Sequence, residues 1–123
     1  LIDRVIAKAK DRITTARTKE KYSEILNTLV LDAIQALEPS LLEKQNIILH
    51  FDERDEAISK KIIKTLEKNV ILKYDLSCAG GCIAESEDGL VSTLNTFESR
   101  FQRSLAMIQQ ILSVFFERKM STS

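Results

Sequence analysis

The chain has 123 residues, of which 44% are hydrophobic and 29% are charged, and this composition is typical of one helix-rich globular domain. Its 18 basic residues balance its 18 acidic residues, so the net charge is zero and no overall positive field attracts nucleic acid. Charged residues interrupt positions 1–10, and no stretch reaches the ~20 consecutive apolar residues of a spanning helix, which argues against a signal sequence and direct membrane insertion. We therefore expect a protein of the cytoplasm.

Residues 2–20 are predicted to form a helix that is charged on most sides. Its apolar residues form one thin stripe, made of Ile2, Val5, Ile6, Ala9, Ile13 and Ala16. Such a stripe is too narrow for a large core and fits contact with a single partner helix, although a frayed surface helix is the alternative. Two pairs in the stripe are eleven residues apart, a period associated with right-handed coiling. Because the pattern is helical from its first residues, we expect the natural chain to continue upstream.

The helix is predicted to continue into a more apolar part, which a β-α-β unit follows. Residues 22–37 carry apolar side chains at steps of three and four, so this helix should pack on the core, and Pro39 should end it. Residues 46–51 and 70–74 are apolar runs typical of strands, and the helix between them follows possible capping residues at 52–55. The two strands should be parallel if they share a sheet.

A hairpin and a long helix complete the predicted fold. Residues 82–86 and 90–94 flank an Asp-Gly pair of the kind that a type I′ turn requires. Asn95 and Glu98 should cap the last helix, and residues 119–123 should form a loose tail. The helix should bury one broad side that includes Phe97, Phe101, Leu105, Ile108, Leu112 and Phe115. The predicted class is α+β, with a long N-terminal helix, a small mixed sheet packed with helices, and a long C-terminal helix.

The polar residues form no pattern typical of a catalytic or metal site. Cys78 and Cys82 are separated by three residues, and with a single histidine in the chain they lack ligands for zinc, so we expect a reduced, partly buried pair. His50 lies in a predicted strand without a nucleophile motif nearby. The Gly80-Gly81 pair lacks the lysine and serine of a phosphate-binding loop and fits a sharp entry into the strand or a close backbone approach. No catalytic residue, cofactor, metal or small-molecule substrate is predicted.

One segment carries a family resemblance. It runs Gly80-Gly81-Cys82-Ile83-Ala84-Glu85-Ser86-Glu87-Asp88-Gly89 and is followed by Asn95-Thr96-Phe97-Glu98-Ser99-Arg100. The order and spacing resemble the signature of the E subunit of V-type and A-type ATPases. The residues that carry it, called the family motif below, are Gly80, Gly81, Asp88, Gly89, Asn95, Thr96, Glu98 and Arg100. A looser similarity covers residues 22–116, while Cys82 replaces a more usual valine and residues 90–94 lack the alternating basic residues of many members.

The resemblance implies a division of the chain and a set of partners. Residues 1–21 would be the end of a stalk helix, residues 22–118 the globular domain, and residues 119–123 a flexible tail. The globular domain would dock on the B subunit of the catalytic head. The stalk helix would pair with a helix of the G subunit through Ile2, Val5, Ala9, Ile13 and Ala16.

The implied function is that of a non-catalytic peripheral-stalk (stator) component in a rotary ATPase. Such a component lies in the cytoplasm, peripheral to the membrane, and resists rotation of the catalytic head while ATP is coupled to ion transport. A free-standing α+β interaction module and a small enzyme are the alternatives, because fold similarity does not fix function. A charged, proline-poor helical extension upstream would favour the stalk, and a native start near residue 1 would favour the free module.

Overall fold

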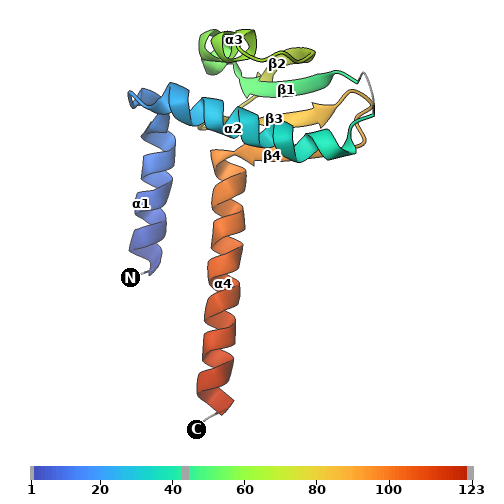
Figure 1. Ribbon diagram of the computed structural model, residues 1–123. Helices are drawn as coiled ribbons and strands as arrows, with labels where there is room; N and C mark the ends of the chain where they lie inside the picture. The colour runs from blue at the N-terminus through green and yellow to red at the C-terminus, as the bar shows by residue number, and fades with distance from the viewer. Residues whose placement is uncertain (1, 43–44, 122–123) are drawn as a thin grey trace.

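A four-stranded sheet forms the centre of the molecule, and two helices extend away from it (Figure 1). The computed structural model describes residues 2–42 and 45–121. In chain order its elements are α1 (Ile2–Thr15), η1 (Ala16–Thr18), α2 (Tyr22–Leu37), η2 (Glu38–Ser40), β1 (Ile47–Asp52), η3 (Glu53–Asp55), α3 (Glu56–Lys64), β2 (Val70–Leu76), β3 (Gly81–Ser86), β4 (Ser92–Thr96) and α4 (Phe97–Ser121), where η marks a 3-10 helix. The predicted α+β fold is confirmed. The predicted loose tail at 119–123 overlaps the last residues of α4, and residues 122–123 lie outside the described residues.

The sheet is mixed, and its strands lie in the order β2-β1-β3-β4. β1 runs parallel to β2, with Ile48 opposite Ile71, and antiparallel to β3, with Ile48 opposite Glu85. β3 and β4 are antiparallel neighbours. The β-α-β unit and the hairpin predicted from the sequence are therefore both present. We call the sheet together with α2 and α3 the globular part.

The core lies between the sheet and helices α2 and α3. The apolar steps of α2 place one face inward, and alternate residues of β1 meet that face. Pro39 lies in η2 directly after α2, as predicted. Each large apolar side chain buried in this layer contributes about 1.5–3 kcal/mol. Those that are at most 2% exposed include Tyr22, Leu26, Val30, Ile34, Leu37, Leu49 and Phe51.

Contrary to the prediction, the N-terminal helix does not continue to Leu37. It ends at Thr15, and the chain turns through η1 and residues 19–21 before α2 begins at Tyr22. Thr14 and Thr15 donate their hydroxyl hydrogen atoms to the carbonyl oxygen of Asp11, at 2.8 and 3.0 Å. This back-bonding weakens and bends helices, and here it accompanies the end of α1. We call residues 16–21 the elbow.

The hairpin turn is not the predicted type I′ turn centred on Asp-Gly. The N–H of Gly89 donates to the carbonyl oxygen of Ser86 at 2.9 Å, so the central residues of the turn are Glu87 and Asp88. Gly89 follows the turn with a φ of 75°. The carboxylate of Asp88 accepts the hydroxyl hydrogen of Ser86 at 2.6 Å, which fixes Asp88 inside the loop. The second strand, β4, consequently begins two residues later than the predicted range of 90–94.

The predicted capping pair of α4 is wrong. Thr96 caps the helix, because its hydroxyl oxygen accepts the backbone N–H three residues further on at 3.1 Å. Asn95 is 4% exposed and donates its amide hydrogen to the carbonyl oxygen of Leu29 at 2.6 Å. Glu98 accepts the backbone N–H of Ala79 at 2.8 Å. Both side chains therefore satisfy backbone groups of neighbouring elements, which a local pattern does not reveal.

The apolar face of α4 is not buried in the globular part, contrary to the prediction. α4 extends away from the sheet over most of its length (Figure 1). Leu105 and Leu112 are only half-buried, and the side chain of Phe115 lies outside the described residues. Apolar side chains with large exposed fractions follow this face: Met107 63%, Ile108 46%, Ile111 61% and Val114 47%. Helical periodicity indicated correctly that the face is apolar, but not that the described chain leaves it open.

Candidate functional site

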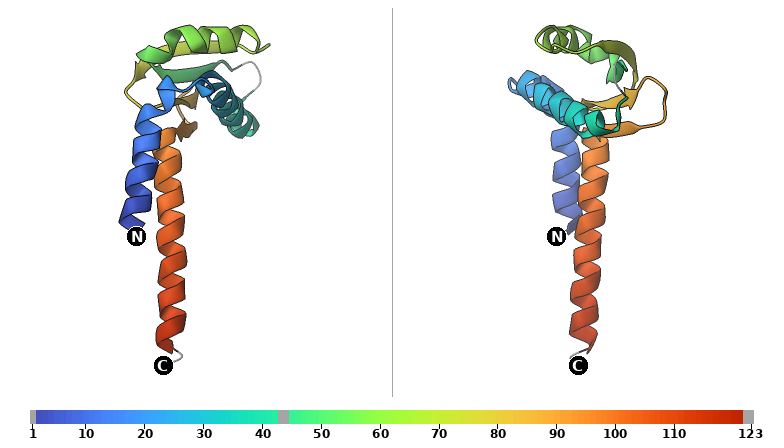
Figure 2. Two further views of the ribbon diagram at one scale, coloured as in Figure 1. Left: turned by 90° about the vertical axis from the view of Figure 1, so that its left-hand side faces the viewer. Right: turned by 45° about the vertical axis from the view of Figure 1, so that its right-hand side comes forward.

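An apolar groove lies between α1 and α4. The two helices lie side by side on the same side of the globular part, and their chain directions are opposite (Figure 2). The groove between them has a volume of about 400 Å³ and is open to solvent. It is lined by Val5, Ile6, Ala9 and Ile13 of α1 and by Phe97, Arg100, Phe101, Ser104, Leu105 and Ile108 of α4. The stripe predicted on the first helix therefore faces a helix of the same chain.

The apolar stripe of α1 is only partly covered by α4. Val5 is 65% exposed, while Ala9 and Ile13 are half-buried. Ala16 packs against the core of the globular part instead of lining the groove. Ile2 lies in α1, but its side chain is outside the described residues. Apolar surface thus stays open between the two helices, and contact of the stripe with a partner helix stays a prediction.

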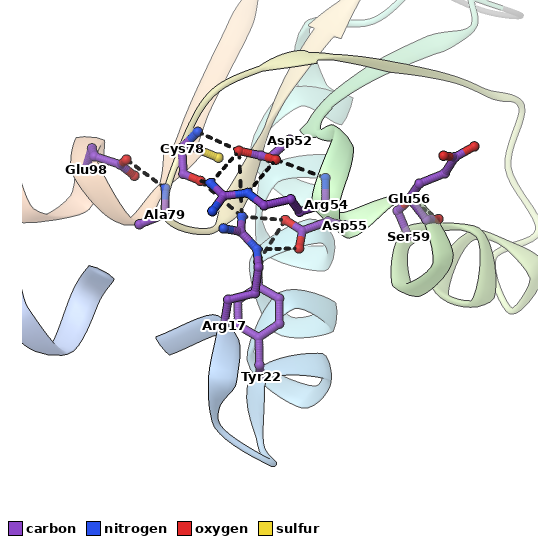
Figure 3. A network of polar contacts seen from close by, with 10 residues as sticks. All are labelled: Arg17, Tyr22, Asp52, Arg54, Asp55, Glu56, Ser59, Cys78, Ala79 and Glu98. Carbon is purple, nitrogen blue, oxygen red and sulfur yellow. Dashed lines mark hydrogen bonds and ion pairs between the residues drawn. The ribbon is translucent and has the colours of Figure 1, made fainter. Parts of the chain in front are cut away.

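A buried ion pair holds the elbow at the base of α1 (Figure 3). Arg17 donates from Nε to Oδ1 of Asp55 at 2.9 Å and from Nη2 to Oδ2 at 3.1 Å. Asp55 is 0% exposed, and its Oδ2 also accepts the hydroxyl hydrogen of Tyr22 at 2.8 Å. Burial and the bond to Asp55 raise the pKa of Tyr22, so its hydroxyl stays a donor. The sequence analysis missed this arrangement.

A second carboxylate joins β1 to the connection between β2 and β3. Asp52 accepts hydrogen bonds from Nε and Nη2 of Arg54, at 3.0 and 2.9 Å, and from the backbone N–H of Cys78 at 3.0 Å. The carbonyl oxygen of Cys78 accepts from Nη2 of both Arg17, at 3.0 Å, and Arg54, at 3.1 Å. These contacts form what we call the Arg17 network, made of Arg17, Tyr22, Asp52, Arg54, Asp55 and the backbone of Cys78.

The glycine pair of the family motif lies where β3 passes close to β4 and α4. A Cβ atom on Gly80 would lie 2.7 Å from the ring of Phe97. A Cβ atom on Gly81 would lie 2.4 Å from the carbonyl oxygen of Asn95, and Gly81 has a φ of 96°. The predicted close backbone approach is confirmed at Gly81, whereas the atoms that crowd Gly80 belong to side chains.

The other motif residues connect the hairpin to α4. Asp88 lies in the turn, Gly89 follows it, and Thr96 caps the helix. Arg100 donates from Nη1 to Oδ1 of Asn95 at 3.0 Å, so that Asn95 bonds to both α2 and α4. These contacts position α4 on the globular part. A role of the motif in binding another protein stays a prediction.

Residues 1–116 match the model of a family described as the ATP synthase (E/31 kDa) subunit. The chain belongs to this family. The A-type ATP synthase E subunit 2 of Methanospirillum hungatei is 30% identical over 103 residues, which cover 84% of this chain and 50% of that protein. The A-type ATP synthase E subunit of Methanococcus aeolicus is 29% identical over an alignment of 123 positions, and this alignment covers 94% of this chain and 61% of that protein.

The resemblance to the E subunit inferred from the family motif is therefore confirmed. A further relative, the A-type ATP synthase E subunit of Thermococcus gammatolerans, is 30% identical over 106 residues, which cover 84% of this chain and 51% of that protein. The chain thus spans between 50% and 61% of the length of these E-subunit relatives. Within residues 2–42 and 45–121, no helix combines the length and apolar character needed to cross a membrane.

The cysteines and the histidine of this E-subunit family member lie apart from the groove. Cys78 and Cys82 are free and buried, and burial raises the pKa of Cys82 to about 12, so this thiol stays protonated. His50 lies with Nδ1 2.8 Å from Oδ1 of Asp75 and Nε2 3.4 Å from Oε1 of Glu85. The sequence analysis missed these carboxylates because they come from two other strands. In the described part of the chain, no group of three or more His, Cys, Asp or Glu side chains is placed to hold a metal ion.

The Arg17 network is expected to make the stability of the fold depend on acid pH. Hydrogen bonds from the side chain of Arg54, and then from the N–H groups of Arg54 and Cys78, hold the pKa of Asp52 well below its usual range. A depressed folded-state pKa stabilises the fold above the unfolded-state pKa of about 3.9, and this contribution is lost as pH falls further. When the free energy of unfolding is measured with urea at pH 7 and at pH 3, it should decrease less for Asp52→Asn than for the wild type. Equal losses would contradict this role of Asp52.

Proposed function

We propose that this chain comprises the end of the stalk helix and the globular domain of a non-catalytic peripheral-stalk component in a rotary ATP synthase or ATPase. Its role is to connect the catalytic head to the membrane sector and to resist rotation. It acts in the cytoplasm, peripheral to the membrane, and docks on the B subunit of the head. Membership in the E-subunit family supports the assignment to the complex.

The observation that carries the stalk role is the open apolar surface along α1 and α4. Val5 is 65% exposed in the groove, and Met107 and Ile111, 63% and 61% exposed, extend the apolar face of α4 towards its end. Two antiparallel helices with a shared apolar groove offer a third helix a site with side chains on both flanks. We propose that a helix of the G subunit occupies this groove.

A peripheral stalk requires binding energy and stiffness, and two features of this chain support that role. The globular part has a buried core and a mixed sheet, whereas α1 and α4 leave it on the same side (Figure 1). A partner helix seated between them would bury the apolar surface and join three helices along their length. Bending such a bundle costs more than bending a single helix, because packed side chains must separate.

Placing charges in the groove should markedly weaken binding of the G subunit and spare the globular part. In the variant Val5→Glu/Ile13→Glu, two carboxylates would be desolvated without partners on helix association, so binding should fall by at least about tenfold, equivalent to ~1.4 kcal/mol. The melting temperature should change little, because the main core lies in the globular part. The measurements are a pull-down with the G subunit of the same complex and a thermal melt of the isolated chain.

A matched control has the same net charge change on the outer side of α1. Arg4→Gln/Ala7→Glu alters two exposed residues that do not line the groove, so it should bind the G subunit like the wild type. Normal binding by the Val5→Glu/Ile13→Glu variant would overturn the assignment of the groove. Unfolding of that variant would show that the stripe serves internal packing instead.

A further inference from the structure

We propose that Arg17 is a positioning residue that fixes the angle at which α1 leaves the globular part. Its importance for a stalk rests on the proposed function, but the positioning itself is a property of this chain alone. Arg17 lies in η1, within the elbow that separates α1 from α2. The direction of α1 depends on the conformation of these few residues.

The elbow has few other attachments to the globular part. Its backbone hydrogen bonds are local. The N–H of Lys19 donates to the carbonyl oxygen of Ala16 at 3.0 Å, and the N–H of Tyr22 donates to the carbonyl oxygen of Lys19 at 3.1 Å. Residues 18–21 are exposed, and the small side chain of Ala16 packs only at the edge of the core. Arg17 is the elbow residue whose side chain reaches buried groups of the globular part.

Arginine suits this position because its planar group is held from two directions. Nε and Nη2 bond to the two oxygens of Asp55, at the end of η3, while Nη2 also bonds to the carbonyl oxygen of Cys78, in the connection between β2 and β3. A guanidinium held by two segments cannot rotate about one bond, whereas the ammonium group of lysine acts as a point charge.

The groups that receive Arg17 are themselves fixed. Asp55 is fully buried and bonded to Tyr22, and Asp52 holds the backbone of Cys78 in place. Within residues 2–42 and 45–121, no buried side-chain oxygen or nitrogen lacks a hydrogen-bond partner. The carboxylate of Asp55 and the carbonyl oxygen of Cys78 are therefore held in place to receive Arg17.

The same connection also holds the first turn of α4. Glu98 accepts the backbone N–H of Ala79 at 2.8 Å, next to the carbonyl oxygen of Cys78 that accepts from Arg17 (Figure 3). The bases of both groove-forming helices are thus bonded to neighbouring residues of one loop. Arg17 sets α1, Glu98 contributes to setting α4, and together they determine how wide the groove opens.

The angle of α1 can be measured by electron paramagnetic resonance on the isolated chain. Spin labels at Ala7→Cys on α1 and Lys61→Cys on α3 occupy two exposed positions. The native cysteines are buried, and labelling of the chain without added cysteines checks that they do not react. We expect Arg17→Lys to shift and clearly broaden the distance distribution between the two labels. Lysine keeps the charge beside Asp55 but lacks the planar group that bonds to both oxygens of Asp55 at once.

The control is Arg12→Lys, the same change at an exposed position of α1 one turn before the elbow, and its distribution should match that of the wild type. If Arg17→Lys does not fold, Arg17→Met/Asp55→Asn removes both charges, leaves no unpaired buried ion, and should show the same broadening. An unchanged distribution in a folded variant would overturn the proposal. Broadening in a chain that does not bind the G subunit would leave the positioning role intact and contradict the proposed function instead.

Discussion

Asp55→Ala is expected to lower the free energy of unfolding by about 3–5 kcal/mol, the cost of removing one partner from a buried ion pair. Asp55 is 0% exposed and accepts two hydrogen bonds from Arg17 and one from Tyr22. Its loss leaves a guanidinium and a hydroxyl group facing an apolar methyl group. Urea unfolding of the isolated chain at pH 7, followed by circular dichroism, measures the change.

The adjacent residue provides a matched control. Glu56 carries the same charge, but its side chain is 53% exposed and its partner is Lys60, one helical turn further along α3. Exposed ion pairs of this kind contribute little, so Glu56→Ala should unfold like the wild type within experimental error. A loss for Asp55→Ala no larger than that of Glu56→Ala would show that the Arg17 network does not stabilise the fold.

The sequence did not reveal the Arg17 network, although it contained every member. Asp52 and Asp55 were predicted only as possible helix caps, and Arg17 was given no role within the predicted first helix. Asp52 does accept the N–H of Arg54 at 2.9 Å, so part of that local prediction is confirmed. The contact between Arg17 and Asp55 spans 38 residues of sequence, and no local spacing indicates it.

The elements of the globular part could be predicted because their patterns are local. Alternation in β1 and the apolar steps of α2 depend only on which face meets a core, and the β-α-β unit then makes β1 and β2 parallel. The groove could not be predicted in the same way. Periodicity showed an apolar face on α1 and another on α4, but it does not state which helices meet.

The capping error has a clear physical cause. Asn-x-x-Glu is a local signal, yet Asn95 bonds to Leu29 and Glu98 bonds to Ala79 in the folded chain. Tertiary hydrogen bonds thus outweighed the local preference for a capping box. The Gly81 prediction succeeded because a close backbone approach needs a residue without a side chain whichever element supplies the neighbour.

Gly81→Ala is the second change with a large expected effect, a loss of about 2–5 kcal/mol from backbone strain and crowding together. The φ of 96° is strained for alanine, and its Cβ atom would lie 2.4 Å from the carbonyl oxygen of Asn95 and 2.7 Å from Cα of Thr96. Both neighbours are backbone atoms of β4. That strand cannot shift freely, because Asn95 is bonded to Leu29 and Thr96 caps α4.

Gly89→Ala separates the two causes of the expected loss. Gly89 also has a positive φ, of 75°, but a Cβ atom there would meet nothing within 4 Å. Its substitution should therefore cost only the left-handed backbone strain, about 1–2 kcal/mol. Thermal and urea unfolding of the two variants should place Gly81→Ala clearly below Gly89→Ala in stability. Equal losses would mean that β4 yields to the added methyl group, and the close contact between β3 and β4 would then not be what fixes the start of α4.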